Sequence, residues 1–164
     1  MPSSAIVTAF RNVVSRFPEK PALISGETSV TYSELEALSA SFAKQVAERV
    51  KGDTVALLIP NCISFAPAFL GALWAGKTVA VLPTLAPPPI IKMMVASVGA
   101  ESVITTQDLL PKLLESGIPS FPYEIGNTGM RGISICPTGM RRAFAVLGYP
   151  GVLGSPFGFI TLPR

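Results

Sequence analysis

The run Thr54-Val55-Ala56-Leu57-Leu58-Ile59, followed at once by Pro60, sets the fold of this chain. Its residues are apolar at both alternating positions, which is typical of a strand covered on both faces in a parallel sheet. A helix is predicted next, because Ser64 is a suitable N-cap and Pro67 then falls in the first turn, where its missing N–H costs nothing. Gly76 supplies the left-handed residue that commonly ends a helix. The stretch therefore predicts a buried strand, a turn and a helix.

The same order of strand and helix follows twice more. Residues 78–82 and 102–105 are further short apolar runs, and each precedes apolar residues at helical spacing. The helical positions are Ile91, Met94, Val95 and Val98, closed by Gly99, and then Leu109, Leu110, Leu113 and Leu114. This alternation predicts right-handed crossover units in an α/β fold, with the three strands parallel and flanked by helices.

A helix and a hairpin are predicted upstream of these units. Apolar residues recur at helical spacing over residues 6–17, with Ser4 available as a cap and Pro18 as a stop. The segment lacks the basic start, the unbroken apolar run and the cleavage pattern of a secretory signal. Residues 22–32 hold short apolar runs around a Ser-Gly-Glu turn, which is the pattern of a β-hairpin.

A second helix is predicted to begin after Thr31 and to end at Gly52. The Thr31 hydroxyl can accept from the backbone N–H of Glu34, whose carboxylate can reach back, so the two form a capping box. One face of this helix is apolar, at Leu35, Leu38, Phe42 and Val46. Thr31, Tyr32 and Glu34 are explained by this local structure without chemistry, and Glu34 and Glu36 point to different faces, so they are not a paired acid and base.

A membrane span is the competing interpretation of the apolar centre. Residues 54–76 are 23 consecutive residues without a charge, a length that suffices for a span. Pro60, Asn61, Ser64 and Pro67 interrupt the run, however, and favour a short strand followed by a helix. Residues 143–163 are also uncharged, but three prolines and four glycines disfavour a single helix there. We therefore predict no membrane span.

Composition excludes several classes of site. The 164 residues are 49% hydrophobic and 14% charged, and they contain no histidine. A Ser-His-Asp or Cys-His relay, an HExxH zinc site and imidazole acid–base catalysis are therefore ruled out. Two cysteines, Cys62 and Cys136, are too few for a disulfide framework or a four-cysteine metal site. A reduced, cytoplasmic protein is expected, in which Cys62 is a buried structural thiol and Met93 and Met94 fill a helix face.

Charge divides the chain near residue 124. Residues 1–124 hold nine Lys/Arg and ten Asp/Glu, whereas residues 125–164 hold four arginines and no lysine or acidic residue. The arginines, scattered through a Gly/Pro-rich stretch, are Arg131, Arg141, Arg142 and Arg164. A nucleic-acid-binding protein usually clusters its cations among aromatic residues or on one helix face, so we predict no nucleic-acid binding.

Five blocks in register over residues 3–115 carry a family resemblance. They are Glu19-Lys20-Pro21-Ala22-Leu23-Ile24; Val30-Thr31-Tyr32-Ser33-Glu34-Leu35; Val55 to Asn61 with Phe65, Ala68 to Ala72 and Ala75-Gly76; Val81-Leu82-Pro83; and Gly99 to Thr106. Together they resemble the N-terminal portion of AMP-forming acyl-CoA synthetases, members of the adenylate-forming superfamily. The resemblance implies the N-terminal part of that family's large α/β domain.

The resemblance also implies an activity for the full-length family. Such a ligase couples a carboxylate to ATP, releases pyrophosphate and transfers the acyl group from acyl-AMP to the thiol of coenzyme A. ATP, Mg²⁺ and coenzyme A are thus implied as cofactors and co-substrates of the full-length family, and a fatty acid is the substrate class expected from family frequency. None of these is expected to be bound by the present chain alone. Catalysis would depend on positioning and on neutralising phosphate charge.

The chain departs from this family after residue 124. The family's phosphate loop, rich in Ser, Thr and Gly and ending in Pro-Lys-Gly, has no recognisable counterpart here, nor has its lysine-bearing C-terminal domain. Residues 126–132, Gly-Asn-Thr-Gly-Met-Arg-Gly, follow a predicted strand at 120–125 but lack the lysine, and Arg131 is a poor replacement for a compact charge. We interpret them as a surface loop. Phe157-Gly158-Phe159 is only a faint match to an aromatic stretch of the family and supports no assignment.

Two hypotheses follow from the sequence. In the first, residues 1–124 are a partial AMP-binding domain of an acyl-CoA synthetase, interrupted or put out of frame near residue 124, and inactive as this chain. In the second, the chain is a small α/β binding or interaction module whose basic tail, residues 125–164, docks on an anionic partner. No catalytic residue and no metal ligand is assigned, and cofactor-binding residues are left open. We also expect a poorly packed tail and a tendency to self-associate.

Overall fold

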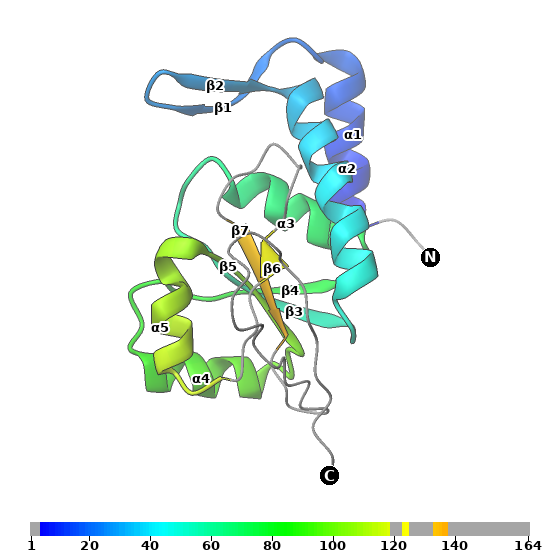
Figure 1. The fold of residues 1–164 in the computed structure, drawn as a ribbon. Helices are drawn as coiled ribbons and strands as arrows, with labels where there is room; N and C mark the ends of the chain where they lie inside the picture. Colours follow the sequence, from blue (N-terminus) through cyan, green and yellow to red (C-terminus); the bar gives the residue numbers. More distant parts are fainter. Residues whose placement is uncertain (1–3, 119–122, 125–132, 138–164) are drawn as a thin grey trace, which may run out of the picture.

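The computed structural model describes residues 4–118, 123–124 and 133–137. An N-terminal helix, a hairpin and a long helix precede three strand–helix units (Figure 1). The elements are α1 (Ala5–Arg16), β1 (Pro21–Ser25), β2 (Thr28–Thr31), α2 (Tyr32–Arg49), β3 (Thr54–Leu58), α3 (Phe65–Trp74), β4 (Thr78–Val81), α4 (Pro88–Ser97), β5 (Ser102–Thr106), the 3-10 turn η1 (Gln107–Leu109), α5 (Leu110–Glu115), β6 (Tyr123–Glu124) and β7 (Ile133–Pro137).

The main sheet has the order β4-β3-β5-β7-β6. β3 pairs in parallel with β4 and with β5, with Val55 opposite Val79 on one side and opposite Ser102 on the other. The three predicted parallel strands are therefore confirmed. No helix runs through Pro60, and Pro67 is buried in the first turn of α3, as expected. Among the described residues, none of the helices combines the length and the apolar character needed to cross a membrane.

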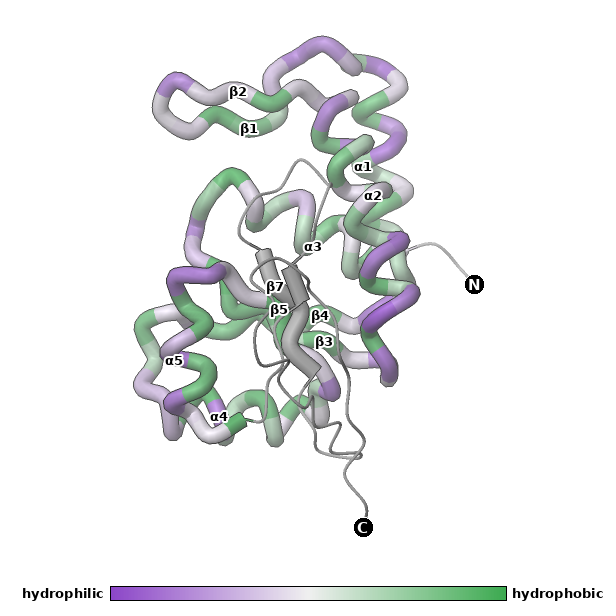
Figure 2. Tube along the Cα trace, viewed as in Figure 1, coloured by the Kyte–Doolittle hydropathy of each residue, from purple (hydrophilic) through white to green (hydrophobic). Residues whose placement is uncertain are grey.

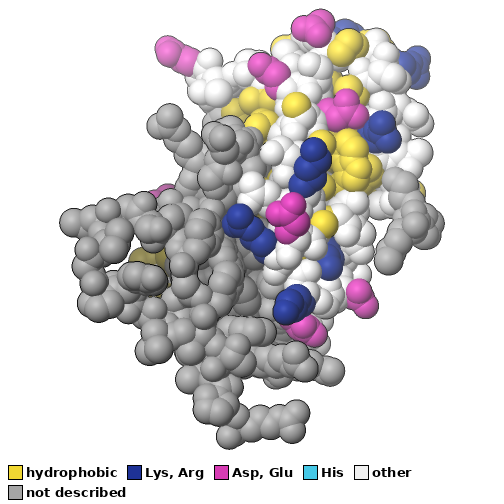
Figure 3. Space-filling model, turned by 45° about the vertical axis from the view of Figure 1, so that its right-hand side comes forward, with side chains coloured by type: hydrophobic (Ala, Val, Ile, Leu, Met, Phe, Trp, Pro, Cys, Tyr) yellow, Lys and Arg dark blue, Asp and Glu magenta, His cyan; other side chains and the backbone are white. Residues whose placement is uncertain are grey.

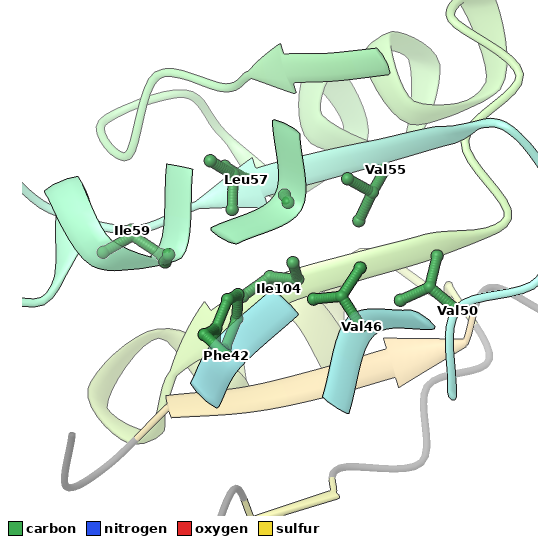
Figure 4. Close-up of a cluster of buried hydrophobic side chains, with 9 residues drawn as sticks. Phe42, Val46, Val50, Val55, Leu57, Ile59 and Ile104 are labelled. Atoms are coloured by element: carbon green, nitrogen blue, oxygen red, sulfur yellow. The ribbon is translucent and has the colours of Figure 1, made fainter. Parts of the chain in front are cut away.

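Two core clusters cover the opposite faces of this sheet. On one face, α2 and α3 pack over the alternate side chains of β3 that point toward them (Figure 4). This first cluster contains Phe42, Val46, Val50, Val55, Leu57, Ile59, Ala68, Ala72 and Ile104. On the other face, α4 and α5 cover the second cluster, which contains Ala56, Leu58, Leu82, Ile91, Val95, Ala100, Val103, Leu113 and Ile118. Burial on both sides explains why β3 is apolar at nearly every position and why β5, although it carries hydroxyl residues, has no charge.

The hairpin and the two N-terminal helices lie beside the α3 face of the sheet, and the hairpin projects away from it (Figure 1). Gly26, at φ +59°, makes the tight turn between β1 and β2. The capping box of α2 is confirmed: the Thr31 hydroxyl accepts from Glu34 N at 3.2 Å, and Glu34 Oε2 accepts from Thr31 N at 2.8 Å. Hydrophilic residues gather along the outer side of α2 (Figure 2).

Three local expectations are wrong in detail. Ser4 and Ser64 occupy the N-cap positions of α1 and α3, but neither side chain makes a cap hydrogen bond. Ser64 has helical angles, φ −78° and ψ −13°, instead of the extended conformation that directs a cap side chain toward the first turn. α2 ends at Arg49, and Gly52 instead makes the turn into β3 at φ +77°, with the Glu101 carboxylate close against it.

Part of the tail joins the sheet, which corrects the expectation of a poorly packed tail. β7 pairs antiparallel with β5 over five positions, from Ser102 opposite Pro137 to Thr106 opposite Ile133. β6 extends the sheet by a further antiparallel pair, and it lies within the strand predicted at residues 120–125. The physical reason is that β5 has a second edge with free backbone groups, which an additional strand satisfies. The remainder of residues 125–164 lies outside the described residues.

Candidate functional site

A topological switch point lies between β3 and β5. The connection from β3 leads into α3, which packs in the first core cluster, whereas the connection from β5 leads through η1 into α5, which packs in the second. The chain therefore leaves two neighbouring parallel strands toward opposite faces of the sheet. In open α/β sheets, ligands bind in the crevice that such a divergence leaves at the carboxyl ends of the strands. This end of β3 and β5 is the candidate site.

Two threonines close the β5 side of the site. Thr105 is fully buried, and its hydroxyl donates to the carbonyl of Leu58 at 2.9 Å, which ties the ends of β3 and β5 together. Thr106 is 9% exposed, and its hydroxyl has no hydrogen-bond partner among the described residues. By strand alternation, Thr106 lies on the same face as Ile104, the face covered by α2 and α3. The side chains that β5 contributes at the candidate site are therefore uncharged hydroxyl groups.

The β3 side of the site is a tight turn into α3. The Cys62 amide donates to the Pro60 carbonyl at 2.8 Å, and the Phe65 amide donates to the Cys62 carbonyl at 3.0 Å. Asn61 and Cys62 are both exposed. The expectation that Cys62 is a buried structural thiol is wrong, because the Pro-Asn turn carries it out of the strand before the helix begins. Its thiol is open to solvent at the carboxyl end of β3.

The side chain of Lys112, on α5, holds the loop after β4 by a hydrogen bond. Lys112 Nζ donates to the carbonyl of Thr84 at 2.6 Å, and the Ala86 amide closes a turn onto the Pro83 carbonyl at 3.1 Å. Lys112 is thus engaged with backbone and is not directed to a ligand. Leu85, at the tip of this loop, is 92% exposed.

A surface concavity lies between α1 and α2. It is an open cleft of about 490 Å³ lined by Thr8, Arg11, Asn12, Val14, Ser15 and Glu36. Arg11 Nε and Glu36 Oε1 form an ion pair at 3.3 Å, and the Arg11 guanidinium also lies 5.3 Å from the centre of the Trp74 ring. Charges of both signs alternate over this face of the molecule (Figure 3). An exposed, already paired arginine makes this a solvated surface cleft.

Two carboxylates near the start of α2, Glu34 and Glu36, have defined contacts. Hydrogen bonds from the Thr31 backbone and hydroxyl lower the pKa of Glu34, and this carboxylate belongs to the helix cap. Glu36 is engaged with Arg11, a contact separate from that of Glu34. That the two carboxylates are not a catalytic pair stays a prediction. Within residues 4–118, 123–124 and 133–137, no group of three His, Cys, Asp or Glu side chains could hold a metal ion.

Several residues singled out in the sequence lie outside the described residues. These are the loop at 126–132, the four tail arginines and Phe157 to Phe159. One residue of the site, Thr106, was missed, because a threonine at the end of an apolar run reads as ordinary strand. Only the register of β5 against β3, which places Thr105 opposite Leu58, reveals its position at the switch point.

Known proteins match the same part of the chain that forms these units. The sequence profile of the AMP-binding enzyme family matches residues 10–123. A 4-coumarate–CoA ligase from Pinus taeda is 35% identical over 106 residues, 62% of this chain and 20% of its own length. Long-chain-fatty-acid–CoA ligases are 30% identical over 104 residues in Yersinia pestis and 28% identical over 117 residues in Salmonella typhimurium. The chain spans about a fifth of the length of these curated relatives.

Solved structures give the same relationship in three dimensions. The N-terminal domain of FACL13 from Mycobacterium tuberculosis superposes with a TM-score of 0.63 at 26% identity, over 70% of this chain and 30% of that domain. A fatty acyl CoA synthetase from Mycobacterium tuberculosis gives 0.60 at 26% identity, over 67% of this chain and 23% of that structure. A benzoate CoA ligase from Burkholderia xenovorans gives 0.62 at 26% identity, over 67% and 23%.

Proposed function

The chain belongs to the AMP-binding enzyme family, and from this premise we propose that residues 1–124 supply the N-terminal part of the AMP-binding domain of a carboxylate–CoA ligase. The match over residues 10–123 carries this proposal. The reaction proposed for the complete ligase forms acyl-AMP from a carboxylate and ATP, with release of pyrophosphate. The thiol of coenzyme A then displaces AMP to give the thioester.

A fatty acid is the substrate class that we propose. Relatives named long-chain-fatty-acid–CoA ligases in several bacteria support it, and one structural neighbour is a fatty acyl CoA synthetase. The 4-coumarate and benzoate ligases among the matches act on aromatic acids by their names, so they mark the competing class. No described residue forms an acyl pocket that would select between them. A cytoplasmic location stays a prediction.

The described residues do not by themselves fit ATP and Mg²⁺. The strand ends offer hydroxyl and backbone groups, Lys112 is bound to a carbonyl, and no cluster of carboxylates is present in the described part. We therefore derive no chemical step through these groups. We propose instead that the 164-residue chain alone makes no acyl-CoA, a proposal supported by its match to only about a fifth of each relative.

Thioester formation tests the proposed inactivity. The purified chain is incubated with ATP, Mg²⁺, coenzyme A and either a fatty acid or 4-coumarate, with the full-length Salmonella typhimurium ligase as the positive control. We expect turnover by the control only. Turnover by the 164-residue chain would refute the proposed inactivity, and the preferred acid would identify the substrate class directly.

A chimera tests whether the unit is a working part of a ligase. Residues 10–118 replace their counterpart in the Salmonella typhimurium ligase, to which the chain aligns over 117 residues. Thioester synthesis by the chimera, above that of the same ligase lacking this segment, is expected if the fold is a ligase part. A folded but inactive chimera would count against the proposal. The coding DNA, read downstream and in the other two frames, would also show whether a phosphate loop and a lysine-bearing domain follow.

The alternative function, a small α/β interaction module, has one observation in its favour. Residues 133–137 of the basic tail form β7 and pair with β5 over its full length, so at least this part of the tail belongs to the sheet. A module of this kind would bind an anionic partner through its arginines. Binding of the full chain to anionic vesicles or heparin that disappears when Arg131, Arg141 and Arg142 are changed to Gln would favour the module.

A further inference from the structure

One edge of the main sheet is left open by the described part of the chain. β4 has β3 as its neighbour on one side and no described strand on the other. The Thr78 amide donates to the Asp53 carbonyl at 2.7 Å, and the Leu82 amide donates to the Leu57 carbonyl at 2.8 Å. Because backbone groups of alternate residues point to opposite sides of a strand, the N–H and C=O groups of Val79 and Val81 face the open edge.

Within the described residues, this edge lacks the usual protection against pairing. Edge strands are commonly guarded by charged side chains, bulges or a covering segment. Lys77, the nearest cation, donates to the Gly52 carbonyl at 2.8 Å, and residues 78–91 carry no charge. Val81 is 52% exposed. The opposite edge of the described sheet differs, since β6 is only two residues long.

We infer that a second copy of this chain pairs with the β4 edge, antiparallel and about a twofold axis through Ala80. In this register, Val79 of one copy faces Val81 of the other, and the outward groups of both residues exchange four hydrogen bonds. An axis shifted toward Val81 would place Val79 opposite Pro83, which has no N–H to donate. An axis shifted toward Val79 would place Val81 opposite the charged Lys77.

Charge supports this occupant. With the axis at Ala80, Lys77 of one copy faces Pro83 of the other, so no like charges are placed opposite each other. The pairing joins two five-stranded sheets into one and satisfies backbone groups that the described chain leaves open. Only one four-residue strand from each copy takes part, so we expect a reversible dimer that dissociates on dilution.

Sedimentation velocity of two variants tests the edge. Val81→Pro removes one outward N–H without touching the amides that bind β3. Those belong to Thr78 and Leu82 and, by the register of the parallel pair, to Ala80. Val81→Thr keeps the N–H and a β-branched side chain, and it serves as the matched control. We expect the natural chain and Val81→Thr to sediment as a concentration-dependent dimer and Val81→Pro as a monomer with the same circular dichroism. A natural chain that stays monomeric at all concentrations, or a folded Val81→Pro that dimerises equally, would overturn the inference.

Cross-linking tests the register and does not depend on the proline variant folding. Ala80→Cys and Thr78→Cys are each made in a background with Cys62→Ser and Cys136→Ser, so that the introduced cysteine is the only thiol. At the axis, the two residue-80 Cα atoms would lie about 4.5 Å apart, which suits a disulfide. Two residue-78 Cα atoms would be four residues out of register, roughly 13 Å apart. Rapid oxidation of Ala80→Cys to a linked dimer supports the register, whereas equal or faster linkage of Thr78→Cys contradicts it. The thioester assays above are independent of either result.

Discussion

Replacing Gly71 by alanine tests how closely α2 and α3 approach. A Cβ at this position would lie 2.8 Å from the Ser39 carbonyl oxygen and 2.8 Å from Phe42 Cδ1, whereas ordinary contacts begin at 3.4 Å. The two helices must therefore separate by about 0.6 Å, or the Phe42 ring must leave its packed position in the first core cluster. Overpacking of this kind costs about 1–3 kcal/mol, while the gain in helix propensity over glycine returns about 1 kcal/mol.

One of the two short contacts is with backbone, so the overpacking cost lies in the upper part of its range, about 2–3 kcal/mol. The net expectation is a free energy of unfolding lowered by roughly 1–2 kcal/mol, seen as a melting temperature several degrees lower. Circular dichroism melting and urea unfolding measure it, with Ala96→Gly on the exposed side of α4 as the control for propensity alone. In a Phe42→Leu background, Gly71→Ala should lower the free energy of unfolding by less than in the natural chain but still lower it, because the Ser39 carbonyl belongs to the backbone and stays in place. An unchanged or raised melting temperature for Gly71→Ala would show that the interface has room and that the close approach does not govern stability.

Three further predictions rest on single side chains. Thr105→Val should lower the free energy of unfolding by about 1 kcal/mol, because it removes the hydrogen bond to the Leu58 carbonyl. Thr106→Val should be neutral or stabilising, because the Thr106 hydroxyl has no partner among the described residues. Urea titrations measure both, and equal effects would contradict the assigned hydrogen bonding. The pKa of Glu34 is lowered in the folded state, so its ionised carboxylate stabilises the fold fully above the usual carboxyl range, and this stabilisation is lost as pH falls through the lowered pKa. The melting temperature of Glu34→Gln should therefore depend less on acid pH than that of the natural chain. Parallel profiles of melting temperature against pH would count against this. Cys62 should react with a thiol reagent in the folded chain, a fast phase that Cys62→Ser should abolish.

The parallel units and the capping box follow from short-range physics. β3 is buried on both faces, and its hydrophobic run, ended by Pro60, allowed no other strand position. Thr31 and Glu34 are three residues apart, so their reciprocal hydrogen bonds depend on local geometry alone. For the same reason, the charge-free stretch around Pro60 and Pro67 resolved into a strand and a helix.

The features that sequence reasoning missed depend on contacts between distant segments. β7 joins the sheet because β5 offers it an edge. Its Ile-Ser-Ile alternation is too short, within a Gly/Pro-rich tail, to predict a strand from the sequence alone. Cys62 was expected inside because cysteine is usually buried, but the direction of the turn after β3 decides its exposure. The candidate site was likewise hidden, since a switch point is a property of strand order and not of any one strand.

The three parallel strands differ in burial, and the candidate site and the proposed dimer edge lie on different strands. β3 and β5 are buried along nearly their whole length and diverge at the switch point, whereas β4 is exposed at both ends of its four residues. β3 stands between the β4 edge and β5, so a partner strand added to β4 does not lie next to Thr105 and Thr106. Self-association through β4 and the role of this unit in a ligase are therefore compatible. A complete ligase that places a strand of its own on β4 would abolish the dimer without changing the candidate site at the ends of β3 and β5. A monomeric chimera with thioester activity would therefore assign the β4 edge to the rest of the ligase chain.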